Sequence, residues 1–206
     1  GYGGIGVIVE ATLQLVDNVK VQRKSEIVQA EGYPSYFAQN IRNKKNIVFQ
    51  NGDLYPPNYD EVNSISWTVT DKPLTDTARI NAGDEKYWLE HKLMKVVSWG
   101  RFGKWFRKTF IDPYYYREDI VLWRNYEASY DVRGLEPINT GNKTYVLQEY
   151  FIPVENMKSF TPKMRDIFNK HRVNVVNVSL RHALPDTESF LSWAPKEVFA
   201  YVIYYQ

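Results

Sequence analysis

The hydrophobic pattern of the chain predicts the same order of elements twice. Strict alternation and β-branched residues mark strands, whereas apolar residues three or four positions apart mark helices. The first unit is a strand, a helix and two strands at residues 19–28, 33–41, 46–50 and 62–69. The second has the same order at residues 144–152, 155–171, 173–180 and 197–205. Asn51, Gly52 and Asp53 have the composition of a turn after the third element.

Two β-α-β-β units can join their strands into one antiparallel sheet with both helices on one face. We therefore expect an α+β fold built from two ferredoxin-like units. Residues 84–135, between the units, have apolar residues at helical spacing and predict a helical insertion. Within it, residues 101–108 are basic and aromatic. This run could contact a membrane surface or an anionic partner, and the favoured alternative is a solvated helix face.

The first sixteen residues have a different character. A glycine-rich turn is followed by a β-branched run, which predicts a strand over residues 7–15. The segment lacks the basic start and long apolar centre of a signal peptide, and it does not begin with Met. We expect it to come from within a longer protein.

Composition excludes several classes of function. The chain has no Cys, so disulfides, thiolate catalysis and Cys-based metal sites are ruled out. Its 3 His residues include no pair at metal-ligand spacing, and we predict no metal site. A net charge of +2 is small for a nucleic-acid binder. No apolar run is long enough to cross a bilayer, and we expect a cytoplasmic protein that could lie at a membrane surface.

Several segments resemble FAD-linked oxidases of the vanillyl-alcohol-oxidase type. Residues 3–13 are similar to the strand that closes the FAD-binding domain in that family. The other similar segments, which resemble bacterial FAD/FMN-containing dehydrogenases related to aldonolactone and alditol oxidases, are residues 37–42, 51–57, 123–131, 145–153 and 177–182. The resemblance implies that residues 1–16 end an FAD-binding domain and that residues 17–206 form the substrate, or cap, domain.

The resemblance also implies FAD as the cofactor. The backbone of the glycine turn and the residues after it would lie along the flavin nucleotide, since glycine permits close approach of main-chain N–H groups. The residues concerned are Gly4, Gly6, Val7 and Ile8. In the alditol-oxidase branch, a strand ending in Glu-x-Arg places its Arg near substrate hydroxyls and flavin. Arg181 matches that Arg, and Ser179 stands where the Glu would be.

The strand that ends at Arg181 offers one polar face. Because side chains alternate, Asn177, Ser179 and Arg181 share this face and could bind substrate. Arg181 could stabilise an alkoxide or a reduced, anionic flavin, and an ordinary surface salt bridge is the alternative. His182 points to the other face and could act as a general base. A structural histidine at a strand end is the favoured alternative.

Further candidates come from two other segments. Arg124, Glu127 and Tyr130 share one face if their segment is helical, and could form the polar wall of a substrate pocket. An ion pair between Arg124 and Glu127 is the favoured alternative. Glu149 lies within a strand rich in apolar residues and needs a partner if it is buried. Arg181 on a neighbouring strand is the candidate partner, which makes a structural role for Glu149 the favoured one.

Two classes of function follow from these patterns. In the first, the parent protein oxidises an alcohol, sugar or lactone C–OH group by hydride transfer to flavin, and this chain supplies the pocket for the small-molecule substrate. The fragment alone would be inactive without the rest of its FAD-binding domain. In the second, the chain is a non-catalytic ferredoxin-like module that binds a ligand or partner. A weaker third option, RNA binding, needs exposed aromatic residues on central strands. Residues 6–16 discriminate between the first two: a fragment leaves them without partner strands, whereas a stand-alone module pairs them.

Overall fold

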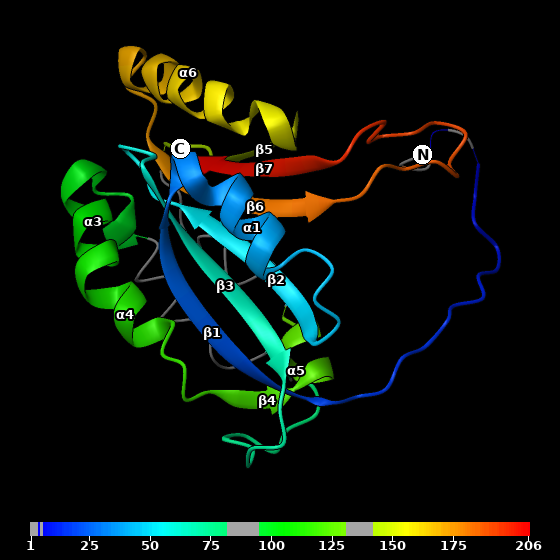
Figure 1. Ribbon diagram of the computed structural model, residues 1–206. Coiled ribbons are helices and arrows are strands. Elements are labelled where there is room, and N and C mark those ends of the chain that lie inside the picture. Colours follow the sequence, from blue (N-terminus) through cyan, green and yellow to red (C-terminus); the bar gives the residue numbers. More distant parts are fainter. Residues whose placement is uncertain (1–3, 5, 82–94, 131–141) are drawn as a thin grey trace.

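The computed structural model describes residues 4, 6–81, 95–130 and 142–206. These residues form one seven-stranded antiparallel sheet in the order β4-β1-β3-β2-β6-β7-β5 (Figure 1). The strands are β1 (Lys20–Gln29), β2 (Ile47–Leu54), β3 (Glu61–Val69), β4 (Val121–Trp123), β5 (Val146–Pro153), β6 (Val175–Ala183) and β7 (Val198–Tyr205). The helices are η1 (Ala30–Gly32), α1 (Tyr33–Asn40), α3 (Gly100–Phe106), η2 (Arg107–Ile111), α4 (Asp112–Tyr115), α5 (Arg124–Ala128), η4 (Val154–Asn156) and α6 (Met157–Lys170).

The predicted duplication is confirmed. The first unit is β1-α1-β2-β3 and the second is β5-α6-β6-β7. The two units meet where β2 pairs with β6, through Gly52 opposite Leu180 and Asp53 opposite Ser179. This pairing joins the strands of the two units into a single sheet. The expected α+β class with an inserted helical segment is therefore confirmed.

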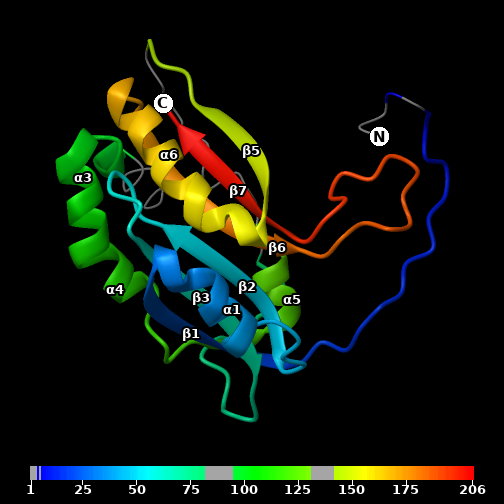
Figure 2. The same ribbon diagram turned by 45° about the horizontal axis from the view of Figure 1, so that its top comes forward.

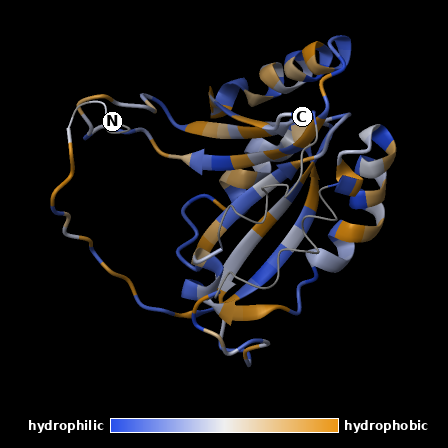
Figure 3. Ribbon diagram, turned by 180° about the vertical axis from the view of Figure 1, so that it is seen from behind, coloured by the Kyte–Doolittle hydropathy of each residue, from blue (hydrophilic) through white to orange (hydrophobic). Residues whose placement is uncertain are grey.

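The main core lies between the sheet and the helices α1 and α6, which cover the same face (Figure 2). Its largest fully buried side chains include Tyr33, Met157, Leu180, Phe199 and Tyr201. Bands of apolar and polar residues alternate along the strands (Figure 3), which directs one set of side chains into this core and the other to the opposite face. That opposite face, hereafter the open face, carries the candidate site.

The insertion packs on the open face. The described part of it runs from Lys95 to Tyr130 and contains α3, η2, α4, β4 and α5. Arg107 reaches residues of β2 and β6, Lys104 reaches Asn174 just before β6, and β4 extends the sheet beside β1. The apolar residues that predicted a helix around residue 90 lie outside the described residues. Within the described part, no helix has the length and apolar character needed to cross a bilayer.

The strand predicted at residues 7–15 is wrong for this structure. Residues 6–19 are extended and belong to no strand. The aliphatic side chains in this segment are exposed, with Val7 at 89% and Ile8 at 87%. An extended segment buries its apolar side chains and satisfies its backbone only beside a partner strand. None of the described strands pairs with it.

The turn predicted at Asn51, Gly52 and Asp53 is also wrong, because all three lie inside β2. The glycine serves a close contact instead of a turn. A Cβ at Gly52 would lie 2.8 Å from the Tyr33 hydroxyl oxygen and 3.0 Å from Cγ1 of Val62. Gly52 therefore lets the buried Tyr33 ring approach the sheet, and its two polar neighbours, Asn51 and Asp53, point to the open face.

Candidate functional site

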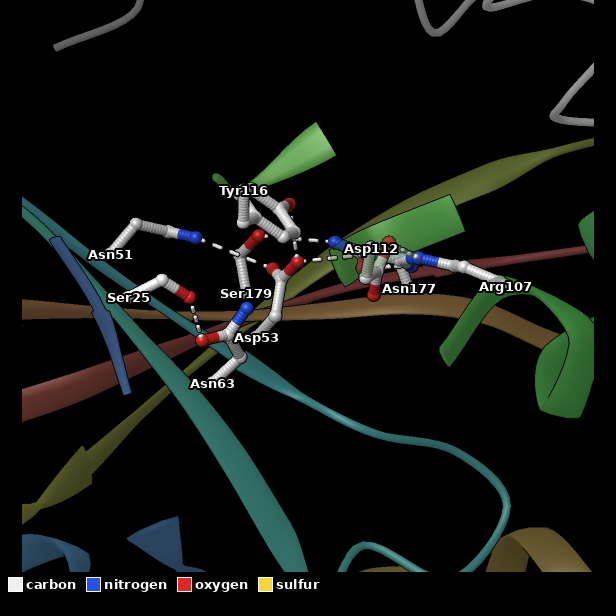
Figure 4. Close-up of polar contacts among 9 residues, drawn as sticks. All are labelled: Ser25, Asn51, Asp53, Asn63, Arg107, Asp112, Tyr116, Asn177 and Ser179. Atoms are coloured by element: carbon white, nitrogen blue, oxygen red, sulfur yellow. Dashed lines mark hydrogen bonds and ion pairs between the residues drawn. The ribbon is translucent and has the colours of Figure 1, made fainter. Parts of the chain in front are cut away.

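An arginine with only 15% of its side chain exposed joins the insertion to the centre of the open face (Figure 4). Arg107 donates from Nη2 to Oδ2 of Asp53 at 2.8 Å, from Nη1 to Oδ1 of Asn177 at 2.8 Å and from Nε to Oδ1 of Asp112 at 3.1 Å. The Tyr116 hydroxyl donates to the same Asp53 oxygen at 2.8 Å. We call these five residues the Arg107 cluster. It joins β2, β6, η2 and α4 at the seam of the two units.

The cluster places one cation beside two carboxylates away from water. Burial by itself lowers the pKa of Arg107, but Asp112 and Asp53 outweigh it and raise the pKa above its usual value. Burial raises the pKa of the Asp112 carboxyl, with Arg107 opposing. The Tyr55 side chain also interacts with this carboxyl and, like Arg107, lowers its pKa. Arg107 thus stays charged and holds both carboxylates, and it begins a π-helical turn, a distortion often seen at functional sites.

The predicted polar face of β6 continues from this cluster. Asn177 donates from Nδ2 to the Ser179 hydroxyl at 3.1 Å, and both are half-buried. Arg181 follows on the same face and is exposed. Its guanidinium has no hydrogen bond or ion pair to any described residue, so the salt bridge considered as an alternative is not formed. The structure therefore leaves a free cation on the open face beyond the insertion.

The other two residues considered around this strand have different surroundings. His182 points to the helix-covered face, as predicted, and its Nε2 lies 2.7 Å from Oε1 of Glu197. Its ring also packs against Phe37, with ring centres 4.7 Å apart. These contacts are those of a structural histidine at a strand end, the alternative that the sequence favours. Glu149 is exposed on β5 and forms no ion pair with Arg181 in the described part, so the expected pairing does not occur.

A pocket of about 450 Å³ lies beside the cluster on the same face. Its floor is formed by Arg23, Ile65 and Trp67 of β1 and β3, and Tyr116 connects its wall to Asp53. The remaining walls come from α4, β4, α5 and the residues near them, including Tyr114, Tyr115, Leu122, Tyr126, Glu127 and Tyr130. Tyrosine side chains and two carboxylates, Asp76 and Glu127, thus surround a largely aromatic space, a composition suited to a small polar or ring-shaped ligand.

Arg23 is held in place at the floor of the pocket. Its Nε and Nη2 donate to the Arg117 carbonyl oxygen at 3.2 and 3.0 Å, and Nη2 also donates to the Tyr115 carbonyl. The guanidinium carbon lies 5.5 Å from the Trp67 ring centre and 5.8 Å from that of Tyr116. Burial lowers the pKa of Arg23, against the raising effect of nearby Tyr115 and Glu127. These contacts fix a rigid cation in an aromatic frame.

Glu127 supplies the opposite charge. Burial raises the pKa of its carboxyl to about 7, although Arg23 and the Trp67 side chain oppose this shift. The cation that acts on Glu127 is therefore Arg23 of β1, and no ion pair forms with Arg124 in its own helix. The guanidinium of Arg124 lies over Phe49 instead, 5.8 Å from the ring centre. Of the three residues predicted to form a pocket wall, Glu127 and Tyr130 do so and Arg124 does not.

Replacing Glu127 by Gln is expected to change how stability depends on pH. A folded-state pKa near 7, above the ordinary 4.5, means that the folded chain binds the proton more tightly. Stability from this group is therefore full below pH 4.5 and falls as pH rises through 7. Glu127→Gln should abolish that fall and add about 1 to 3 kcal/mol at neutral pH. Urea unfolding at several pH values measures it, with the exposed Glu149→Gln as control; identical pH curves for wild type and Glu127→Gln would contradict the assignment.

Sequence reasoning did not identify the Arg107 cluster or Arg23. Asp53 and Arg107 are separated by 54 positions, and the packing of η2 on β2 and β6 brings them together. The sequence feature that could have indicated this cluster is the pair of polar residues, Asn51 and Asp53, that flank Gly52 next to a predicted strand. The predicted cofactor residues Gly4, Gly6, Val7 and Ile8 lie in the exposed N-terminal segment and contact none of these sites. Among the described residues, no three His, Asp or Glu side chains are grouped to hold a metal ion.

No protein-family model and no curated protein matches the chain. Function therefore has to be argued from the residues and geometry described above.

Proposed function

We propose that this chain is the substrate-side part of an FAD-dependent oxidoreductase that oxidises an alcohol, sugar or lactone C–OH group. One observation carries the proposal. The segment that resembles the closing strand of an FAD-binding domain is also the segment whose aliphatic side chains find no partner strand, including Val9 at 94% and Leu15 at 81% exposed. This is the outcome expected of a strand whose neighbours belong to another domain.

The residues of this segment fit one edge of a flavin nucleotide. A Cβ placed on Gly6 would meet no atom within 4 Å, so a ligand can approach the backbone closely there. The N–H groups of the following residues form no ladder with any described strand and are free to donate. The described residues offer no enclosed cradle for a whole dinucleotide, and the rest of the FAD-binding domain is the partner that the proposal requires.

The open face would supply the substrate contacts. Arg181 would donate to the oxygen of the reacting C–OH group and stabilise the negative charge that develops there as the hydroxyl proton passes to solvent at this exposed face. Ser179 and Asn177 hold further hydroxyl groups, oriented by Arg107 behind them. The flavin, when bound, accepts the hydride from the carbon. A cytoplasmic location belongs to the same proposal.

The proposal is tested with the full-length protein that contains this sequence. Purified protein should show the visible absorption of bound flavin, and a substrate alcohol, sugar or lactone should bleach it. A control preparation of residues 17–206 alone should stay colourless. Full-length protein that remains colourless after FAD is added would refute the proposal.

A second candidate function is favoured by the pocket around Glu127. Its lining comes from described residues of this chain, so ligand binding there needs no flavin. In that case the chain is a non-catalytic binding module. A colourless full-length protein whose Trp fluorescence nevertheless responds to a sugar or aromatic acid would support this function, provided that the response is lost in Trp67→Phe and kept in Trp193→Phe, since Trp193 is 51% exposed and lies outside the pocket.

A further inference from the structure

The helix α3 and the turn η2 have two basic side chains on their inner side and three large aromatic side chains on their outer side. Lys104 is buried at 8% exposure and Arg107 lies in its cluster, whereas Phe102, Trp105 and Phe110 are 61, 53 and 56% exposed. A helix on the surface of a protein in water normally turns its aromatic residues inward and its basic residues outward. These outward aromatic side chains therefore have no covering partner within the part of the chain that the structure describes.

The inward turn of α3 is fixed by close packing. A Cβ on Gly103 would lie 1.9 Å from the Val96 carbonyl oxygen, so the glycine side of the helix has to face the preceding segment. Lys104 Nζ donates to Oδ1 of Asn174 at 2.9 Å, which ties the same side to the sheet. The helix cannot rotate to bury its aromatic residues without losing these contacts.

Four neighbouring rings, of which Phe106 is half-buried and the others are exposed, form one continuous surface, which we call the aromatic face: Phe102, Trp105, Phe106 and Phe110. Ring centres are 5.8 Å apart between Phe102 and Trp105, and 5.7 Å apart between Trp105 and Phe110. Phe106 joins Phe102 at 6.4 Å and Phe110 at 5.2 Å. Isolated exposed apolar residues are ordinary, but a contiguous aromatic patch marks an interaction surface.

A cationic groove borders the aromatic face. It has a volume of about 430 Å³ and lies between α3 and the loop after β2. Its lining includes Arg101, Lys104 and Lys108 against one carboxylate, Asp60. Lys108 pairs with Glu61. Arg101 is exposed and has no partner in the described part, and residues 95–111 contain five Lys or Arg residues and no Asp or Glu.

We propose that the aromatic face and this groove dock the protein on an anionic phospholipid bilayer. Trp and Phe rings insert at the level of the headgroups, where such side chains are favoured. Arg101 then binds the phosphate of a lipid headgroup at the groove. Lys104 stays bonded to Asn174 and adds positive charge behind the groove, where burial and nearby Arg101 lower its pKa. The exposed cation Arg101 beside the aromatic face favours an anionic membrane over a neutral membrane or an uncharged apolar partner.

Vesicle co-sedimentation of the full-length protein tests this docking. We expect binding to vesicles of phosphatidylcholine mixed with phosphatidylglycerol, weaker binding to pure phosphatidylcholine, and release by high salt. Trp105→Ser should weaken binding about tenfold, since it removes one buried aromatic ring. Arg101→Gln should weaken only the binding that depends on anionic lipid. Trp193→Ser is the matched control, because Trp193 is 51% exposed compared with 53% for Trp105.

The variants separate this surface from other apolar parts of the chain. Both Trp variants should keep the wild-type circular dichroism spectrum, since neither side chain is buried. Equal loss of binding in Trp193→Ser and Trp105→Ser would overturn the proposal, as would equal binding to both kinds of vesicle. Failure of wild-type protein to bind anionic vesicles would overturn it as well. None of these outcomes depends on whether the protein binds flavin.

Discussion

Replacing Arg107 by Met is expected to lower the free energy of unfolding by about 3 to 5 kcal/mol. The substitution keeps much of the side-chain volume but removes the cation from between Asp53 and Asp112. Both carboxylates are then buried without a counter-charge, and Asn177 loses its donor. Urea unfolding monitored by fluorescence measures the loss. Because α3 and α4 are fastened to the sheet through this residue, we expect the insertion to loosen first.

Two comparisons identify the cause of that loss. Arg101→Met removes an exposed arginine six positions earlier and should change stability by less than about 0.5 kcal/mol. In Arg107→Met, the unpaired carboxyls acquire pKa values above those of the unfolded chain, so acidification should recover part of the lost stability. A loss below about 1 kcal/mol, unchanged by pH, would mean that water already reaches the two carboxylates.

The duplicated units could be predicted from the sequence because each of their elements carries its own local pattern. Phe37 and Ile41 fall on one side of α1, and the alternation in β6 directs Val178 and Leu180 to the core and Asn177 and Ser179 to the open face. This periodicity arises because one face of a strand is buried in the core while the other is not, so it can be recognised within each element alone. The order of elements was therefore correct even where residue boundaries shifted.

The failures have a shared physical origin in contacts that are distant in sequence. Gly52 has the composition of a turn residue, but its role is set by the Tyr33 ring above it. The β-branched residues from Val7 to Val9 favour an extended backbone, yet a strand also needs a neighbour. Composition determines local preference, whereas pairing depends on segments elsewhere in the chain or in its partner.

The site residues divide in the same way. Glu127 and Tyr130 could be predicted as a pocket wall because their spacing alone places them together in one turn. Arg23 could not, since it reaches Glu127 only through the pairing of β1 with β4 at the sheet edge. Arg107 was interpreted as part of a solvated basic run, because charge along a helix does not reveal that the basic side faces inward.

Replacing Arg181 by Met in the flavin-loaded full-length protein is expected to slow flavin reduction about a hundredfold. The size follows from the usual effect of removing one group that stabilises an oxyanion. Arg181 is exposed and unpaired in the described structure, so its loss should leave the fold intact. Arg181→Lys should retain the charge but lose the planar guanidinium group, so its rate of flavin reduction should lie between those of wild type and Arg181→Met. Stopped-flow absorbance under anaerobic conditions gives the reduction rate.

A matched control separates catalysis from general loss of positive charge. Arg165 on α6 is 40% exposed, lies on the helix-covered side of the sheet and is paired with Asp166, so Arg165→Met should reduce flavin at the wild-type rate. If Arg181 contributes mainly in the transition state, its loss lowers kcat with little change in KM. A raised KM at unchanged kcat would instead assign Arg181 to substrate binding. Unchanged values of both would remove it from the site, and the open face would then need another cation to hold the substrate.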